Sequence, residues 1–131
     1  MFKRIKEWLA GERTVYKVIW KATNESCVVE GMAAVKYKQG MWVSAPDWLA
    51  KQGYWLTCFE TFAQASQFKC NEVLFAVWEC RAREIKRQLP QVYEPLNLSR
   101  GRMLYPGDQW PKGTIMAKQL KLVKLCANSG R

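Results

Sequence analysis

The residues of this chain that are best suited to chemistry are positive side chains interleaved with aromatic rings in its last third. A cation can hold a phosphate while an aromatic ring stacks on a base, which is the combination found in proteins that bind single-stranded nucleic acid. We predict that the following residues contact an anionic partner: Arg81, Arg83, Lys86, Arg87, Arg100, Arg102, Tyr93, Tyr105 and Trp110.

The distribution of charge supports such a partner. Residues 81–131 contain eleven Lys or Arg and three acids, whereas residues 1–80 contain ten Lys or Arg and eight acids. A one-sided positive field attracts nucleic acid or an acidic protein surface. Because no sequence signature of a known nucleic-acid-binding fold is present, the prediction depends on charge and aromatic content alone.

Charge and aromatic content leave three readings of function open. We expect first a non-enzymatic binding or accessory protein that contacts an anionic partner, nucleic acid, through residues 81–102. The second is a protein–protein interaction or self-assembling module, in which an N-terminal helix or exposed tryptophans form a homo-oligomer. The third is a small enzyme acting on a nucleotide-like substrate. The alternative to all three is that the basic residues form a solvated loop region without a binding function.

Metal, cofactor and thiol chemistry are not expected. The chain has no histidine, and its cysteines are odd in number and form no C-x-x-C pair: Cys27, Cys58, Cys70, Cys80 and Cys126. A mixed zinc site or a histidine-activated thiol is therefore not indicated, and no glycine pattern typical of a phosphate-binding loop occurs. We predict five free thiols, with Cys58 and Cys80 acting as small buried apolar residues.

Acids that could serve as general bases are scattered along the sequence. Glu79 is the most interesting, because it ends an apolar segment where desolvation could raise its pKa. We expect it instead to pair with Arg81 or Arg83. A cleft that brought Glu79 or Glu84 close to Arg81 and Tyr16 would favour the enzyme.

The composition indicates a single domain over residues 1–131. Nearly half of the 131 residues are apolar and seven are tryptophan, which is enough for a buried core. No apolar run approaches the roughly 20 residues that a membrane span needs, and no signal peptide is recognisable, so a cytoplasmic setting is expected. Residues 1–11 read as an amphipathic helix that docks on its own domain or on a second subunit, with an anionic membrane as the alternative.

Hydrophobic periodicity predicts an α+β fold, with a mainly antiparallel sheet of about five strands and one helix packed on a face. Strands are expected at 14–21, 41–44, 54–59, 73–80 and 114–125, and helices at 46–52 and 61–68. Residues 27–37 hold two short apolar pieces separated by Glu30-Gly31. Thr61 should cap the second helix together with Gln64. Residues 90–113, which hold four prolines and three glycines, read as a long connection.

The same patterns predict which side chains are buried. We expect a core in which five residues are in mutual contact: Trp55, Phe62, Phe68, Phe75 and Val77. Trp20 and Trp78 should also be mostly core, whereas Trp42, Trp48 and Trp110 should be partly exposed. In the 14–21 strand, the face that carries Lys17 and Lys21 should be partly wet.

A set of spaced residues resembles small uncharacterised α+β domains of phages and mobile bacterial elements. The pattern comprises Tyr16-Lys17, Tyr37-x-x-Gly40, Thr57-Cys58-Phe59-x-Thr61-x-x-x-Ala65-x-x-Phe68 and Trp110-Pro111-x-Gly113-Thr114. The resemblance covers about 100 residues and implies the fold class without an established activity. Some ADP-ribosyltransferase-like domains share a similar strand–helix rhythm. Their usual catalytic glutamate lies on a late strand, and residues 114–125 contain no acid, which argues against that activity here.

Overall fold

The computed structural model describes residues 11–29, 34–68, 73–91 and 110–126. Its elements are, in chain order, β1 (Glu12–Trp20), β2 (Trp42–Ser44), α2 (Asp47–Ala50), β3 (Leu56–Phe59), α3 (Phe62–Phe68), β4 (Phe75–Lys86) and β5 (Thr114–Leu125). The helix predicted for residues 1–11 and most of the 90–113 connection lie outside the described residues.

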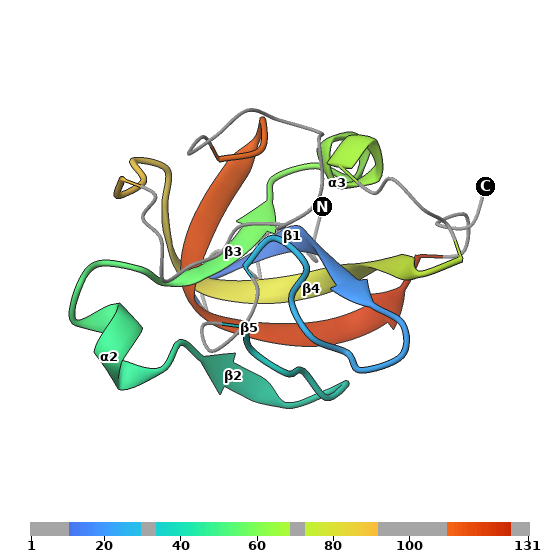
Figure 1. Ribbon diagram of the computed structural model, residues 1–131, viewed down its shortest axis with the longest axis horizontal. Coiled ribbons are helices and arrows are strands. Elements are labelled where there is room, and N and C mark those ends of the chain that lie inside the picture. The colour runs from blue at the N-terminus through green and yellow to red at the C-terminus, as the bar shows by residue number, and fades with distance from the viewer. Residues whose placement is uncertain (1–10, 30–33, 69–72, 92–109, 127–131) are drawn as a thin grey trace.

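The strands form one antiparallel sheet in the order β2-β5-β3-β1-β4, and β4 also pairs with β5. This extra pairing makes β1, β4, β5 and β3 a closed ring, with β2 attached to β5. Figure 1 shows α3 against one face of the sheet and α2 at its edge beside β2. The predicted α+β class and the mainly antiparallel five-stranded sheet are therefore confirmed.

Helix α3 packs over a core built from β1, β3 and β4. Phe68, Phe75 and Val77 are buried there, while Phe62 and Trp55 are partly buried and pack against them. The helix begins where predicted, because the Gln64 backbone N–H donates to the Thr61 hydroxyl at 3.1 Å. The predicted core is confirmed for Phe68, Phe75 and Val77, whereas Phe62 and Trp55, also predicted to be largely buried, are only partly buried against it.

A second core lies on the other face of the ring. It contains Val15 and Ile19 of β1 together with Leu120 and Leu122 of β5. Strands β3, β4 and β5 also contribute small side chains to it: Cys58, Cys80, Ala82 and Ala117. Small side chains suit the narrow space inside a ring of few strands, because only they fit where the strands approach closely.

The segment 34–45 crosses near this second core. Tyr37 is buried in it, and Val35, Val43 and Ala45 pack against it. The two apolar pieces within 27–37 form no strand of the sheet where they are described. Isolated bridges join Ile19 to Ser26 and Glu25 to Lys36. Before β2 begins at Trp42, the apolar side chains of this segment fill the core without forming a continuous ladder of backbone hydrogen bonds.

Strand β4 is longer than the sequence predicted. The sequence suggested that the strand ends at Cys80, but β4 continues to Lys86 through the basic segment. It continues because β1 pairs with it up to Arg83 on one side and β5 pairs with it up to Lys86 on the other. Within this extension, Cys80 and Ala82 turn into the second core, while Arg81 and Arg83 alternate with them and turn away.

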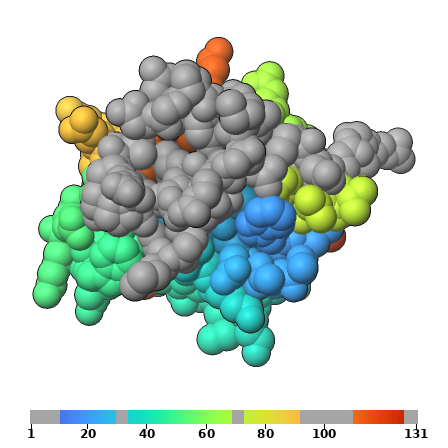
Figure 2. Space-filling model, in the orientation of Figure 1, coloured from blue at the N-terminus to red at the C-terminus, as the bar shows by residue number. Residues whose placement is uncertain are grey.

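Within the described residues, no helix has the length and apolar character required to cross a lipid bilayer. In Figure 2 the α2 region, in green, lies at one side of the surface in view, and the blue segment from residues 11–29 lies toward the other.

Candidate functional site

Arg81, Arg83, Lys86 and Arg87 were predicted to form a basic patch just after the central strand; the first three lie within β4 and Arg87 follows it, and the four do not form one cluster. Arg81 lies opposite Lys121 and Arg83 lies opposite Gln119, whereas Lys86 lies opposite Met116 on the other side of Glu84. Glu84 has a positive φ of 54°, which interrupts the regular alternation of side chains. Arg81 and Arg83 therefore belong to one surface, and Lys86 and Arg87 belong to another.

Arg81 and Arg83 face β2 across β5. Directly opposed residues of an antiparallel pair lie on the same face of the sheet. One row across β4, β5 and β2 therefore consists of Arg81, Lys121 and Trp42. The next row consists of Arg83, Gln119 and Ser44. We call these six residues the Trp42 surface. The Trp42 ring holds two cations, since the Arg83 guanidinium carbon lies 3.7 Å and the Lys121 Nζ 4.9 Å from its centroid.

The Trp42 surface borders an acid at one edge. The Arg83 guanidinium lies 3.5 Å from Glu12 Oε2, and the Arg83 side chain is 41% exposed. Arg83 also donates a long hydrogen bond of 3.5 Å to the Gln119 side-chain oxygen. An exposed ion pair at this distance contributes about 0–1 kcal/mol. Arg83 can therefore exchange Glu12 for another anion at small cost.

Lys86 is the last residue of β4, and Arg87 follows it. The Lys86 ammonium lies 4.5 Å from the Trp55 ring centroid and donates to the Gly53 carbonyl at 2.5 Å. Burial lowers the Lys86 pKa. Arg87 donates to Glu60 Oε2 at 2.5 Å, and this hydrogen bond lowers the pKa of the Glu60 carboxyl.

The remaining predicted site residues lie elsewhere. Arg100, Arg102, Tyr93 and Tyr105 are outside the described residues, so their predicted role stays a prediction. Trp110 packs beside the α3 core, and its indole N–H donates to the Pro90 carbonyl at 2.8 Å. It is partly buried, as expected, and so is Trp42, while Trp48 is 40% exposed.

Lys17 is the feature that sequence reasoning missed. Its side chain is only 1% exposed, although the sequence predicted a partly wet face for β1. Its ammonium donates to Ser26 Oγ at 2.9 Å, to the Thr57 carbonyl at 2.6 Å and to Thr57 Oγ1 at 2.8 Å. Within the described residues these partners are all neutral oxygens. Desolvation by burial lowers the Lys17 pKa to about 8.

Tyr37 lies beside this buried ammonium. The Lys17 Nζ is 5.4 Å from the centroid of the Tyr37 ring, and the Tyr37 hydroxyl is buried without a hydrogen-bond partner among the described residues. Burial raises the pKa of this hydroxyl, so that it stays protonated. A buried donor without an acceptor costs about 1–3 kcal/mol, which makes Tyr37 an unusual feature of the core.

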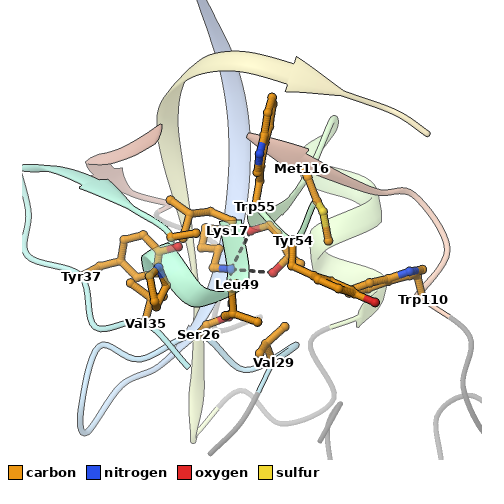
Figure 3. Close-up of a pocket in the computed structure, with 14 residues that line it drawn as sticks. Lys17, Ser26, Val29, Val35, Tyr37, Leu49, Tyr54, Trp55, Trp110 and Met116 are labelled. Carbon is orange, nitrogen blue, oxygen red and sulfur yellow. Dashed lines mark hydrogen bonds between the residues drawn. The ribbon is translucent and has the colours of Figure 1, made fainter. Parts of the chain in front are cut away.

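Lys17 and Tyr37 line a small pocket with a cavity volume of about 20 Å³, which is room for about one water molecule. Figure 3 shows Lys17 in the middle of this pocket, with Tyr37 on one side and Tyr54 and Trp110 on the other. No acid is among the residues that line it. A cleft with Glu79 or Glu84 close to Arg81 and Tyr16 would have favoured the enzyme, and neither glutamate lines this pocket. The Glu84 carboxylate lies 3.7 Å from the Lys118 ammonium.

The described cysteines are free and mostly buried. Cys27, Cys58 and Cys80 are buried and Cys126 is partly buried, as expected for Cys58 and Cys80. Burial raises the pKa of the Cys58 thiol to about 12, although the Lys17 charge opposes this shift. Among described residues, no group of His, Cys, Asp or Glu is arranged to hold a metal ion.

Comparison of the chain with protein-family models, with characterised proteins and with solved structures finds no match. The resemblance to domains of phages and mobile bacterial elements therefore stays a prediction. Function has to be argued from the Trp42 surface and the Lys17 pocket themselves.

Proposed function

We propose that this protein is a non-enzymatic binding protein for an anionic partner, and that the partner is a nucleic-acid backbone. The observation that carries the proposal is the Trp42 ring holding both Arg83 and Lys121, with Arg81 in the same row. Three cations and an aromatic ring on the outward side of three adjacent strands supply both charge and a stacking surface.

The packing of Arg83 against Trp42 favours the binding of an anion and contributes little to the stability of the fold. Arg83 is restrained by the Trp42 ring, so less side-chain entropy is lost when it contacts a phosphate. Its ion pair with Glu12 is long and exposed, and a phosphate can replace the carboxylate at little cost. Gln119 and Ser44 add neutral hydrogen-bonding groups between the cations, with Gln119 donating to Ser44 Oγ at 3.3 Å.

The long-range field favours the same partner. The whole chain carries a formal net charge of +10, and the basic residues are concentrated after residue 80. Such a field speeds the approach of a polyanion and holds it before specific contacts form. Arg100, Arg102, Tyr93 and Tyr105 remain part of the proposed interface on the evidence of their charge and aromatic content in the sequence alone, because they lie outside the described residues.

The proposal is tested by fluorescence anisotropy with labelled single- and double-stranded DNA and RNA at low ionic strength. The variant R81E/R83E/K121E should lose binding by more than tenfold while its circular dichroism spectrum is unchanged. The matched control is K36E/K51E/K112E, which makes the same change in net charge at three exposed residues away from the Trp42 surface. Equal losses in both variants would mean that net charge acts without a defined site, and the proposal would then fail.

An acidic protein surface is the competing partner for the same residues. It predicts that the wild-type protein shows no retention on any nucleic acid at low ionic strength. That result would remove nucleic acid from the proposal and leave protein–protein interaction as the function to pursue.

A further inference from the structure

Strand β1 continues the Trp42 surface beyond β4, whereas the Lys17 pocket is too small for an organic ligand. Glu12 lies directly opposite Arg83 and Thr14 lies directly opposite Arg81, so both share the outward face of the ring with these arginines. We propose that the Trp42 surface binds an unpaired strand of DNA or RNA in preference to a duplex. This preference rests on the proposed function and adds the form of nucleic acid that the surface accepts.

The first argument is the order of side chains across the strands. In the row of Arg83, β1 contributes the acid Glu12. In the row of Arg81, β5 contributes Lys121 and β2 contributes the Trp42 ring. The outward face therefore changes from acidic on β1 to cationic on β4 and β5 and to aromatic on β2. A single strand has the matching order, because cations track its phosphates while aromatic rings stack on its bases. Its phosphates should lie over β4 and β5, and its bases toward Trp42.

A duplex does not match this order. It carries a negatively charged backbone on each of its two strands, and its base faces are already stacked on one another. When one backbone lies over the cations of β4 and β5, a second backbone on the β1 side approaches Glu12, which has the same sign of charge and repels it. On the β2 side, the Trp42 ring finds no open base face.

The second argument is the curvature of the sheet. The strands β1, β4, β5 and β3 close into a ring, and the Trp42 surface lies on its outward side, which is convex. Because neighbouring strands are about 4.8 Å apart, the face from β1 to β2 is only about 14 Å wide. A duplex has a persistence length of about 150 base pairs and does not bend over such a distance without cost. An unpaired strand is flexible and can follow the surface from row to row.

The third argument is the place where the open face ends. Tyr16, the next residue on the outward face of β1 after Thr14, contacts Phe62 of α3 with ring centroids 6.1 Å apart. Val18, the residue after that on this face, is buried in the core that α3 covers. The open part of β1 therefore runs from Glu12 to Tyr16, which is about 13 Å along the strand. A face of this size suits a few nucleotides of one strand, at the lower end of the range of about 4–16 known for single-strand sites.

The test compares paired and unpaired forms of the same strand by fluorescence anisotropy at low ionic strength. The probes are a labelled oligothymidine of about 15 nucleotides and its duplex with oligoadenine, together with oligouridine and its duplex. We expect each single strand to bind at least about tenfold tighter than its duplex. The two pairs of probes distinguish DNA from RNA, and both should show the preference because phosphates and bases are common to them.

The outcomes separate this preference from the proposed function. Equal or tighter binding of the duplexes by the wild type, lost in R81E/R83E/K121E, would overturn the preference and leave nucleic-acid binding at the Trp42 surface standing. If the wild type binds neither form, both the preference and the proposed function fail.

Two variants test the order of side chains directly. E12Q removes the acid on β1 and should raise duplex affinity more than single-strand affinity, which narrows the preference by about threefold. E25Q makes the same change in net charge in the segment after β1 and should leave the preference unchanged. W42L should weaken single-strand binding by at least about fivefold and duplex binding by less, because only the single strand loses a stacking partner. Equal losses of both forms in W42L would contradict the placement of bases at Trp42 and overturn the proposal.

Discussion

Lys17 and Thr57 are joined by two hydrogen bonds from one ammonium, to the Thr57 carbonyl at 2.6 Å and to its hydroxyl at 2.8 Å. This contact links β1 to β3 at a place where their backbone pairing is limited to Tyr16 and Phe59. It holds a lysine inside the protein, where desolvation disfavours its charged form.

The first prediction follows from the Lys17 pKa of about 8, which is below the ordinary lysine pKa of 10.5. Between these two values the unfolded chain binds the proton and the folded protein has lost it, so the Lys17 contribution to stability rises with pH. Below about pH 8 both states are protonated and the full penalty of burial is present.

Comparison with K17M isolates this effect, because other groups titrate alike in both proteins. The free energy of unfolding of the wild type minus that of K17M should increase by about 1.4 kcal/mol per pH unit between about pH 8 and 10. Urea unfolding at fixed ionic strength measures it. A difference that does not change with pH would mean that Lys17 titrates normally in the folded protein.

The second prediction concerns the buried thiols. Burial raises the pKa of Cys58 to about 12 and raises that of Cys80 well above its usual range. At pH 8 the thiolate fraction of Cys58 should be roughly a thousandfold lower than in the unfolded chain, so alkylation is slow. Iodoacetamide labelling read by mass spectrometry should modify Cys126 long before Cys58 or Cys80. Rapid labelling of Cys58 in the folded protein would contradict its burial.

The third prediction concerns Phe68, which is 8% exposed and packs on Phe59 with ring centroids 5.6 Å apart. The substitution F68A should lower the free energy of unfolding by about 3–5 kcal/mol, because it removes apolar contacts and leaves a cavity. Urea unfolding measures the change, and V73A, at a residue that is 79% exposed, should change it little. A loss below 1 kcal/mol would be inconsistent with a closely packed α3.

The fourth prediction concerns the turn before β5. Gly113 has a φ of +85°, and a Cβ built there would lie 2.5 Å from Gln64 Cδ. The substitution G113A should destabilise the protein by at least about 1–2 kcal/mol through backbone strain alone. In the background Q64A the clash disappears and the strain remains, so G113A should cost less there but still be destabilising. Equal costs in both backgrounds would show that Gln64 moves aside freely.

The sequence predicted regular elements well where periodicity and capping agree. Residues 114–125 form β5 with the bounds expected, and Thr61 caps α3 as predicted. These features depend on local preferences and on side chains close in sequence, so they can be read without knowledge of the fold. The Gln64 half of the predicted capping box is not formed, because the Gln64 Oε1 is buried without a hydrogen-bond partner among the described residues.

The Lys17 pocket was not predictable in the same way. A lysine between Tyr16 and Val18 usually marks a wet face, and its burial depends on Ser26, Thr57 and the closure of β4 onto β5. The extension of β4 beyond Cys80 was not predicted. Cys80 and Ala82 face the core in alternation with Arg81 and Arg83, but the two charges made this segment look unlike a strand. The meeting of Trp42 with Arg83 depends on strand order, which periodicity does not give.

The most direct test of the proposed function is the salt dependence of nucleic-acid affinity. If Arg81, Arg83 and Lys121 each neutralise one phosphate, they contribute about 2 to 3 to the negative slope of log affinity against log salt concentration. The wild-type slope should exceed that of R81Q/R83Q/K121Q by this amount, whereas K36Q/K51Q/K112Q should keep the wild-type slope. A slope that is the same in wild type and R81Q/R83Q/K121Q would show that the Trp42 surface does not contact phosphate.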